Sequence, residues 1–340
     1  MATRKTITEE RVSYSTRPTQ SMKSKFLSVI SIVCLSHAAW LANGQAAELS
    51  GTGPGGAART VQFDSLVIFG DSLSDVGNLY ARDNFPPSPY WNGRFSNGPV
   101  WIEQLAADLG MPAPTPSKLG GNNFAWGGAQ TGTGFSTVPV ILSLVPNVSE
   151  QVGIYLATKV VSPTTLYVLW AGANDFFNGQ TDASVPAANI ATAVNTLEAA
   201  GASNFLVLNL PPLGSTPKYL NTPGEAGATA LSDGFNTDLA AGLASLEGIG
   251  KTILLHDVYS DFTRIQANPS QYGLQNTTEQ AMTTAGADAS VFLFWDDVHP
   301  TTVGAGLVAT SVLVPEPATP ALLAFGCLVL MMIRRKKNLA

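Results

Sequence analysis

The chain has 340 residues and a formal net charge of −6, but the stretch from Glu48 to Pro315 holds 8 basic and 21 acidic residues, a net charge of −13. A body this acidic repels phosphate backbones, which argues against a nucleic-acid partner. It also argues against docking on anionic lipid through a basic face.

The first predicted element is a secretory signal peptide. The basic stretch Met22-Lys23-Ser24-Lys25 precedes an apolar run over residues 26–40, which small residues follow. This order is typical of an export signal, with cleavage after Gly44 or Ala46; a buried amphipathic helix is the alternative. We therefore expect residues 1–47 to be an N-terminal extension and signal peptide, with Met22 as the true start.

The next segments predicted are a flexible, Gly-rich lead-in over residues 48–60 and a single folded domain over residues 61–313. Hydrophobic residues make up 45% of the chain and charged ones 12%, a balance that favours folding over disorder. Cys34 and Cys327 both lie near the ends, so the body contains no cysteine. Disulfides, thiolate nucleophiles and Cys-ligated zinc are thereby excluded from it.

Short apolar runs alternate with helical patterns through the body. Runs of this kind suit strands that are buried on both faces of a parallel sheet. The alternation predicts an α/β fold, a three-layer α/β/α sandwich around a central parallel sheet, with active groups beyond the carboxyl ends of the strands. The predicted strands are 65–69, 165–170, 205–210 and 252–255, and the predicted helices are 100–109, 148–158, 187–200 and 228–246.

A serine follows the first predicted strand, in Phe69-Gly70-Asp71-Ser72-Leu73-Ser74-Asp75-Val76-Gly77-Asn78. A serine can attack a carbonyl only if a base takes its proton. His37 lies in the signal peptide, and His256, after an apolar run, is interpreted as a satisfied, partly buried histidine. His299 stands in a polar loop three residues after Asp296, a spacing at which the carboxylate can orient the imidazole. A capping or surface histidine is the alternative for His299.

Two further segments offer donors for an oxyanion, each worth on the order of 3 kcal/mol. Gly127-Gly128 permits close approach of the backbone. Asn174 directly follows the second predicted strand, which places its amide at the same sheet edge as Ser72. Each of these segments alone is weak evidence for a catalytic site. Their order along the chain and their positions at strand ends together indicate acyl transfer through a serine.

These motifs resemble those of the GDSL family of SGNH hydrolases, which are esterases and lipases with a flavodoxin-like fold. The resemblance covers nearly the whole body. It rests on residues 70–78, Gly93-Arg94-Phe95-Ser96-Asn97-Gly98, residues 123–129, residues 172–175, Asn209-Leu210-Pro211-Pro212-Leu213-Gly214 and residues 296–301.

The resemblance implies a serine ester hydrolase that works through an acyl-enzyme and needs no cofactor or metal. Ser72 would be the nucleophile, His299 the base and Asp296 its partner. The oxyanion donors would be the N–H groups of Ser72 and Gly128, in preference to Gly127, and the side chain of Asn174. The implied substrate is a lipid ester or an acylated glycan.

Several residues near these motifs allow more than one interpretation. Asp71, Asp75 and Asn78 are interpreted as fixing the turn. A divalent-metal hydrolase that uses Asp71, Asp75 and His299 is one rival, and a non-catalytic surface or exopolysaccharide-matrix protein that keeps the fold is another. Tyr90, Trp91 and Phe95 either line a substrate pocket or are buried by their loop. Trp126, Trp170 and Trp295 are interpreted as core packing.

The last predicted segment is a sorting tail over residues 314–340. Pro315-Glu316-Pro317 precedes an apolar run over residues 321–333, about 20 Å long as a helix and so shorter than a bilayer core of about 30 Å. The basic block Arg334-Arg335-Lys336-Lys337 follows. The tail resembles the PEP-CTERM signal of Gram-negative bacteria, which an exosortase reads; an ordinary C-terminal anchor is the alternative. It implies transient insertion in the inner membrane and export to the cell surface or extracellular matrix.

Overall fold

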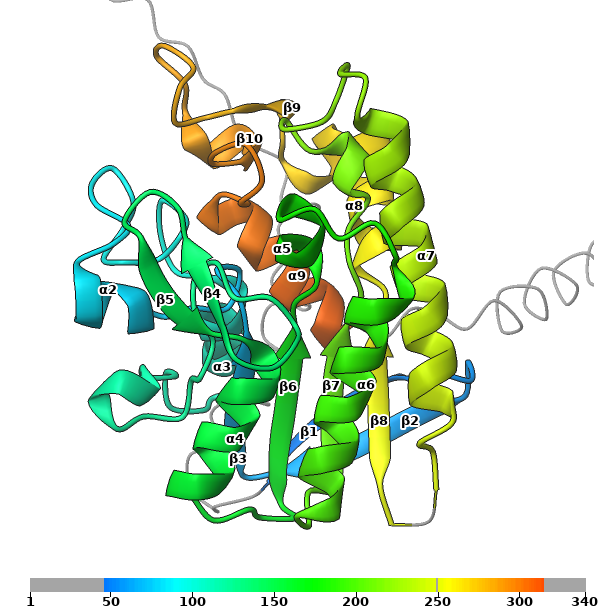
Figure 1. The fold of residues 1–340 in the computed structure, drawn as a ribbon. Coiled ribbons are helices and arrows are strands. Elements are labelled where there is room, and N and C mark those ends of the chain that lie inside the picture. Colours follow the sequence, from blue (N-terminus) through cyan, green and yellow to red (C-terminus); the bar gives the residue numbers. More distant parts are fainter. Residues whose placement is uncertain (1–45, 249, 315–340) are drawn as a thin grey trace, which may run out of the picture. The chain divides into compact units, whose positions relative to one another are not determined.

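A parallel sheet of four strands forms the centre of the protein. The computed structural model describes residues 46–248 and 250–314 (Figure 1). The strands lie in the order β3-β6-β7-β8, and each neighbouring pair is parallel. The predicted α/β fold with a central parallel sheet is confirmed. The strands are β3 (Ser65–Gly70), β6 (Thr165–Trp170), β7 (Asn204–Leu208) and β8 (Thr252–His256).

Three of the predicted helices pack on one face of the sheet: α4 (Val148–Thr158), α6 (Ser184–Ala199) and α7 (Glu225–Ala244). They share one hydrophobic cluster with side chains of β3, β6 and β7. In Figure 1 they lie in front of the strands. Burial of whole apolar side chains, at about 1.5–3 kcal/mol each, favours this layer.

The opposite face is covered by α3 (Trp101–Asp108) and α9 (Thr302–Leu313), which lie behind the sheet in Figure 1. Trp101 stands edge-on to Trp170 of β6, with ring centroids 5.5 Å apart, and its indole N–H donates to Ser74 Oγ at 3.0 Å. Helix α3 is thereby attached both to the sheet and to the turn that follows β3.

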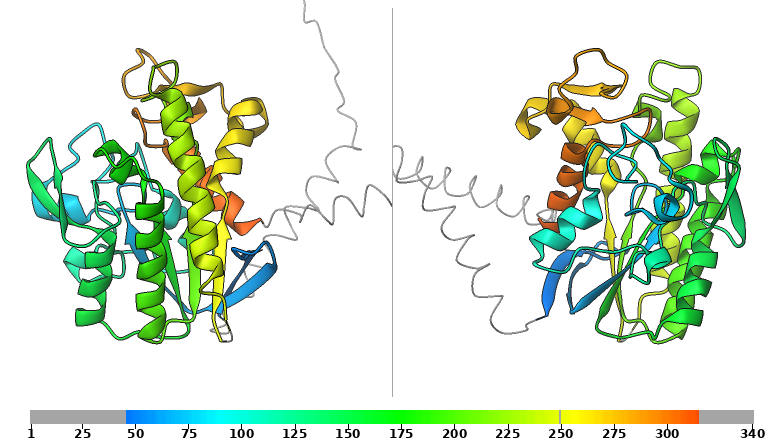
Figure 2. Two further views of the ribbon diagram at one scale, coloured as in Figure 1. Left: turned by 45° about the vertical axis from the view of Figure 1, so that its right-hand side comes forward. Right: turned by 90° about the vertical axis from the view of Figure 1, so that its left-hand side faces the viewer.

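The expectation of a flexible lead-in over residues 48–60 is wrong. This segment forms an antiparallel hairpin of β1 (Ala47–Thr52) and β2 (Ala58–Phe63), seen in blue in both views of Figure 2. The hairpin is stable because its alternate side chains, such as Leu49 and Val61, are buried. Its glycines supply the turn rather than a linker, and the predicted boundary at residue 61 falls inside β2.

The remaining elements are short, and they connect the layers or lie at their edges. None of the described helices, over 46–248 and 250–314, combines the length and hydrophobicity needed to cross a membrane. The other helices and strands are α2 (Asn78–Asp83), α5 (Ala173–Phe177), α8 (Val258–Ala267), β4 (Phe135–Val138), β5 (Ser143–Pro146), β9 (Asn276–Gln280) and β10 (Phe292–Phe294), with 3₁₀ helices at Ser117–Leu119, Leu213–Ser215, Pro269–Tyr272 and Ala289–Val291.

The signal peptide predicted within residues 1–47 and the sorting tail predicted within residues 314–340 lie outside the described residues, apart from 46, 47 and 314. Both stay predictions.

Candidate active site

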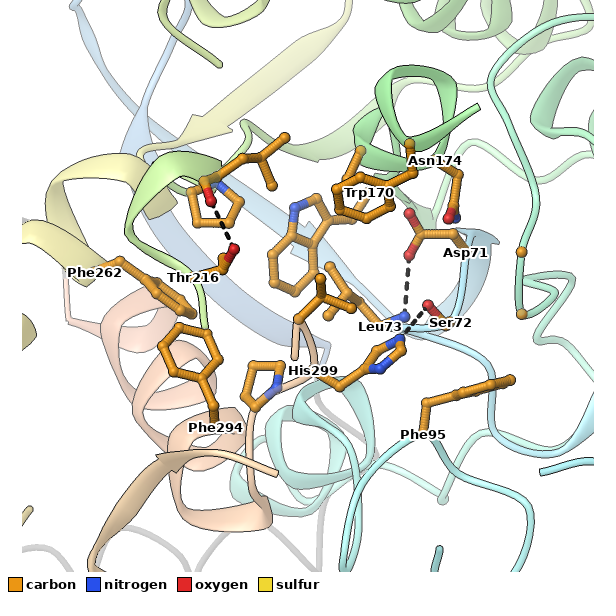
Figure 3. A pocket seen from close by; sticks show the side chains of 18 of the residues that line it. Asp71, Ser72, Leu73, Phe95, Trp170, Asn174, Thr216, Phe262, Phe294 and His299 are labelled. Carbon is orange, nitrogen blue, oxygen red and sulfur yellow. Dashed lines mark hydrogen bonds between the residues drawn. The ribbon is translucent and has the colours of Figure 1, made fainter. Parts of the chain in front are cut away.

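The candidate nucleophile Ser72 lies on a tight turn directly after β3. The turn is closed by the N–H groups of Ser74 and Asp75, which donate to the Asp71 carbonyl at 3.1 and 3.0 Å. The Asp71 carboxylate accepts the Leu73 N–H at 3.0 Å. Ser72 therefore stands at the corner of the turn, and its side chain points into a pocket (Figure 3).

Gly70, the last residue of β3, is held by a glutamine that no sequence motif points to. Gln151 of α4 is fully buried, and its side chain accepts the Gly70 N–H at 2.9 Å and donates to the Gly70 carbonyl at 2.8 Å. A side chain at Gly70 would collide with the Trp170 carbonyl. The turn that carries Ser72 is therefore fixed from two sides.

The imidazole of His299 reaches Ser72 from a loop 227 residues further along the chain. Its Nε2 lies 2.7 Å from Ser72 Oγ, and its Nδ1 lies 2.7 Å from Asp296 Oδ2. The other oxygen of Asp296 accepts the N–H groups of Val298 and His299 at 3.0 and 2.7 Å. The structure thus brings Ser72, His299 and Asp296 into one hydrogen-bonded row, and a surface position for His299 is incompatible with this geometry.

The two ionisable partners of this row shift each other's pKa. Burial alone would raise the pKa of Asp296, but His299 and the backbone donors outweigh it and lower that pKa to about 2. Burial would lower the pKa of His299, but the Asp296 carboxylate outweighs it, so the pKa of His299 rises. The imidazolium form of His299 is thus stabilised beside Ser72. A general base needs this stabilisation because it becomes charged when it takes a proton during the reaction.

Tyr90 is an additional member of this row. Its hydroxyl donates to Asp296 Oδ2 at 2.7 Å, the same oxygen that His299 contacts. The Tyr90 ring packs edge-on against Phe95 and Trp295. Of the three aromatic residues that the sequence left open, Phe95 lines the pocket and Trp91 lies on the surface beside Arg94. Sequence spacing could not connect residue 90 to residue 296.

The groups expected to receive an oxyanion gather beside Ser72. Gly127 donates its N–H to Asp75 Oδ2 at 2.9 Å, so that donor is already used. Gly128 adopts φ 84°, lines the pocket and makes no intramolecular bond through its N–H within the described residues. Asn174 lines the same pocket, and its amide is oriented by donation to the Ala129 carbonyl at 3.0 Å, which leaves its second hydrogen for a ligand.

Asp75 holds the turn, as expected, whereas the Asn78 side chain joins the start of α2 to residues 123–125 by donating to the carbonyls of Asn123 and Ala125 at 2.8 and 2.9 Å. The Asp75 carboxylate accepts the N–H groups of Gly77, Asn78, Leu79 and Gly127. Both oxygens therefore serve the backbone. Within the described part of the chain, no cluster of three or more His, Cys, Asp or Glu side chains is arranged to hold a metal ion.

Asp71 is the remaining titratable group in the pocket. It is buried beside Ser72, and burial raises the pKa of its carboxyl to about 7. Its charge also contributes to the raised pKa of His299. The protonation of Asp71 therefore changes the electrostatics of the site near neutral pH.

The pocket extends away from Ser72 between apolar walls (Figure 3). Thr216 lies among these walls, but its hydroxyl donates to the Leu213 carbonyl at 2.6 Å. Trp170, which the sequence assigned to core packing, both packs in the core and lines this pocket. The apolar lining includes Phe95, Val138, Trp170, Phe177, Phe262 and Phe294.

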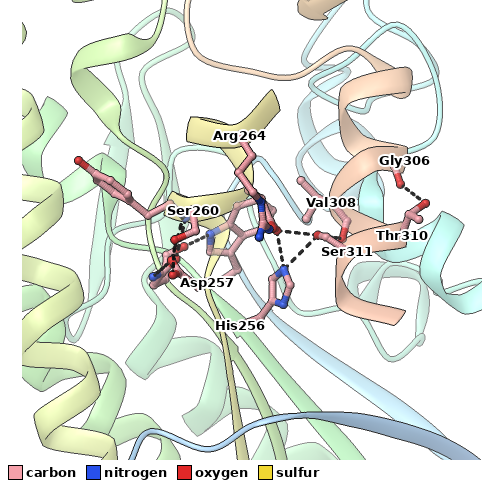
Figure 4. A network of polar contacts seen from close by, with 12 residues as sticks. His256, Asp257, Ser260, Arg264, Gly306, Val308, Thr310 and Ser311 are labelled. Atoms are coloured by element: carbon pink, nitrogen blue, oxygen red, sulfur yellow. Dashed lines mark hydrogen bonds and ion pairs between the residues drawn. The ribbon is translucent and has the colours of Figure 1, made fainter. Parts of the chain in front are cut away.

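His256 lies apart from this row and is satisfied by its neighbours, as expected (Figure 4). Its Nε2 lies 2.7 Å from Asp261 Oδ2 and 3.1 Å from Ser311 Oγ, and Ser311 donates to the same Asp261 oxygen at 2.6 Å. These contacts join β8, α8 and α9, so we assign them to packing.

Comparison with known proteins matches most of the folded domain to one family. The family model described as GDSL-like Lipase/Acylhydrolase matches residues 66–312. The chain is 30% identical over 228 residues to the phosphatidylcholine-sterol acyltransferase of Aeromonas hydrophila, across 63% of this chain and 64% of that protein. It is 29% identical over 282 residues to the thermolabile hemolysin of Vibrio parahaemolyticus, across 74% of this chain and 63% of that protein.

The chain thus spans just under two thirds of the length of these two relatives. Among solved structures, it is similar to a member of the lipolytic protein G-D-S-L family from Veillonella parvula, with a TM-score of 0.45 and 18% identity. That match covers 73% of this chain and 96% of the other.

Proposed function

The chain belongs to the family of GDSL-like lipases and acylhydrolases, and on that premise we propose that it is a serine ester hydrolase that acts through an acyl-enzyme. The observation that carries this proposal is the row Ser72–His299–Asp296, with 2.7 Å between successive side chains. A base within hydrogen-bond reach of a serine, and itself oriented by a carboxylate, is the arrangement that activates a hydroxyl for attack.

In the proposed reaction, Ser72 Oγ attacks the ester carbonyl carbon while His299 Nε2 takes the hydroxyl proton. The N–H groups of Ser72 and Gly128 and the amide of Asn174 stabilise the oxyanion. Collapse of the intermediate breaks the bond to the alcohol, which leaves with the proton from His299. Water then attacks the acyl-enzyme with His299 as base, which releases the carboxylic acid and restores Ser72.

The substrate is an ester whose acyl group enters the apolar pocket, either of a lipid or of an acylated glycan. The lining by Phe177, Phe262 and Phe294 supports an acyl chain longer than acetyl. Rates on a chain-length series of p-nitrophenyl esters, compared with release of acetate from acetylated xylan, test this directly. Rates that rise with chain length support the lipid ester, and flat, weak rates together with acetate release support the glycan.

We also propose that the enzyme is exported by residues 1–47 and sorted by a PEP-CTERM-type tail within residues 314–340 that an exosortase processes. The cell surface or extracellular matrix of a Gram-negative bacterium is then its place of action, after transient insertion of the tail in the inner membrane. The order of basic, apolar and small residues at the front and the Pro-Glu-Pro motif at the back support this. Cell fractionation with antibodies against the body and against the tail tests both steps.

The test of the enzymatic proposal is turnover by the purified chain. Hydrolysis of p-nitrophenyl acetate or butyrate that persists in excess chelator is expected. Failure to hydrolyse any short ester would instead favour a non-catalytic surface or matrix protein, and activity lost with chelator would favour the metal-dependent rival.

A further inference from the structure

The β4–β5 hairpin, residues 134–146, exposes large apolar side chains beside the pocket. Val140 and Leu142 at its tip are 80% and 81% exposed, and Phe135 and Leu144 on its outer face are more than half exposed. In Figures 1 and 2 the hairpin lies apart from the main sheet and next to α2. Contiguous exposed apolar surface marks sites that bind a protein, a ligand or a membrane.

The distribution of charge indicates which of these partners fits the hairpin. Residues 119–149 contain no Asp, Glu, Lys, Arg or His, whereas the body as a whole carries −13. A segment without charge loses no ion hydration when it enters a hydrocarbon boundary. The acidic body would be repelled from an anionic surface but not from a zwitterionic one. The hairpin therefore fits the surface of neutral lipid.

The hairpin is held so that these side chains stay outward. Its inner side chains Val138 and Val145 are buried in a small cluster with Trp126. Arg82 of α2 clamps β5 by donating to the Leu144 carbonyl at 2.7 Å and to Ser143 Oγ at 2.6 Å. The outer apolar residues therefore cannot turn inward without displacing a core that is already packed.

Leu142 also has a backbone conformation that favours Gly or Asn. Its φ is 51°, in the left-handed region, where a residue with a Cβ costs about 1–2 kcal/mol. Leucine at this position therefore lowers stability through its backbone while its side chain is exposed. The backbone cost and the exposure of the side chain are both explained if Leu142 contacts a partner outside the protein.

The hairpin is continuous with the pocket. Val138 on its inner side lines the pocket, and a Cβ on Gly128 would lie 2.9 Å from Val138 Cγ2. At the other end, Pro146 accepts a hydrogen bond at 3.0 Å from Gln151, which also holds Gly70 ahead of Ser72. A ligand seated on the hairpin would lie next to the entrance for the ester.

We propose that the β4–β5 hairpin docks the enzyme on a zwitterionic lipid surface, with Val140 and Leu142 inserted at the boundary between headgroups and acyl chains. The role rests on the proposed ester hydrolase function, because docking places the pocket where lipid esters are concentrated. Phe135 and Leu144 then lie along the surface, and the acyl chain passes Val138 on its way to Ser72.

The test is binding of the full chain to vesicles of a dialkyl ether phosphatidylcholine, a lipid with the zwitterionic headgroup but no ester to hydrolyse. The double variant Val140→Ser/Leu142→Asn removes the apolar tip and places at residue 142 a side chain that tolerates positive φ. We expect vesicle affinity to fall about tenfold or more. The thermal unfolding midpoint should stay unchanged or rise, and turnover of dissolved p-nitrophenyl acetate should stay at the wild-type rate.

The matched control is Leu119→Ser/Val160→Ser, which removes apolar side chains that are 71% and 91% exposed elsewhere on the surface. It should bind vesicles like the wild type. As a local reporter, the fluorescence of Leu142→Trp should shift to shorter wavelength on vesicles and be quenched by brominated lipid.

Equal vesicle affinity of the hairpin variant and the wild type, or no quenching of the reporter, would overturn the proposal. So would a wild-type dimer that the hairpin variant dissociates, because the face would then bind a second copy. If esters are hydrolysed but binding is independent of the hairpin, only this inference fails. If no ester is hydrolysed by any form of the chain, the proposed function fails, whatever the vesicle result.

Discussion

The hydroxyl of Tyr90 lies 2.7 Å from Oδ2 of Asp296, on the oxygen that also orients the imidazole of the candidate base. The donor reduces the charge that this oxygen presents to His299 and helps to hold the oxygen in place beside the imidazole. Tyr90 is therefore a positioning residue in the proposed mechanism, since it touches neither the ester nor Ser72.

Replacement of Tyr90 by Phe keeps the ring packing and removes the donor. We expect kcat to fall roughly tenfold, since a hydrogen bond to a charged group contributes about 1.5–3 kcal/mol. With one donor fewer, Asp296 attracts the imidazolium more strongly, so the pKa of His299 rises and the acid limb of kcat/KM moves to higher pH. Tyr80→Phe, on the half-exposed face of α2, is the control; a Tyr90→Phe profile that superimposes on the wild type would contradict the role.

The pH dependence of the wild type should report the raised pKa of His299. The base must be neutral to act, so kcat/KM should fall below a midpoint that lies above the ordinary histidine value of 6.5. Asp71→Asn removes a negative charge that raises this pKa, so its acid limb should move to lower pH by up to about one unit. A shift to higher pH would show that Asp71 does not act on His299 through its charge.

Asn174→Ala should lower kcat by about 10²–10³ with little change in KM, because an oxyanion donor acts in the transition state. The neighbouring amide of Asn178 lies on the surface at the end of α5, where it donates to the Asn174 backbone carbonyl at 2.7 Å but does not line the pocket. Asn178→Ala should therefore stay within about threefold of wild type. Steady-state kinetics on p-nitrophenyl butyrate make the comparison. Equal effects of the two substitutions would remove Asn174 from the oxyanion site.

Gln151→Leu should destabilise the fold by about 1–3 kcal/mol, because it leaves the buried N–H of Gly70 without a partner. The Gly70 carbonyl loses one of its two donors and keeps the Trp126 N–H, at 3.1 Å. Urea unfolding measures the loss, and Gln271→Leu at an exposed position is the control. If Gln151→Leu unfolds at the wild-type urea concentration, the side chain does not brace the turn before Ser72.

The central sheet could be predicted from the sequence because its strands are buried on both faces and therefore read as continuous apolar runs. Strand β6, predicted at 165–170, has those bounds in the structure. The β1–β2 hairpin was missed because the glycines of its turn have the composition of a linker. Helix α9 was also missed: it begins at Thr302, three residues after His299, and its small, apolar residues show almost no amphipathic pattern.

A residue of the candidate site could be predicted from the sequence only where its chemical type and its position along the chain both point to the site. Ser72 and Asn174 follow apolar strands, and Asp296 is three residues from His299, so strand ends and local spacing point to them. Tyr90 and Gln151 reach the site from a proline-rich loop and from the buried face of α4. No local pattern encodes such contacts, because they depend on how distant segments pack.

Covalent labelling with a fluorophosphonate, followed by mass spectrometry of the peptides, tests whether Ser72 is an activated nucleophile. A serine activated by His299 should take up one phosphonyl group per chain, on Ser72, and Ser72→Ala should take up none. Labelling should slow by orders of magnitude in His299→Ala, since the base is removed. A wild-type chain that stays unlabelled, or that carries the adduct on another serine, would show that Ser72 is not the nucleophile.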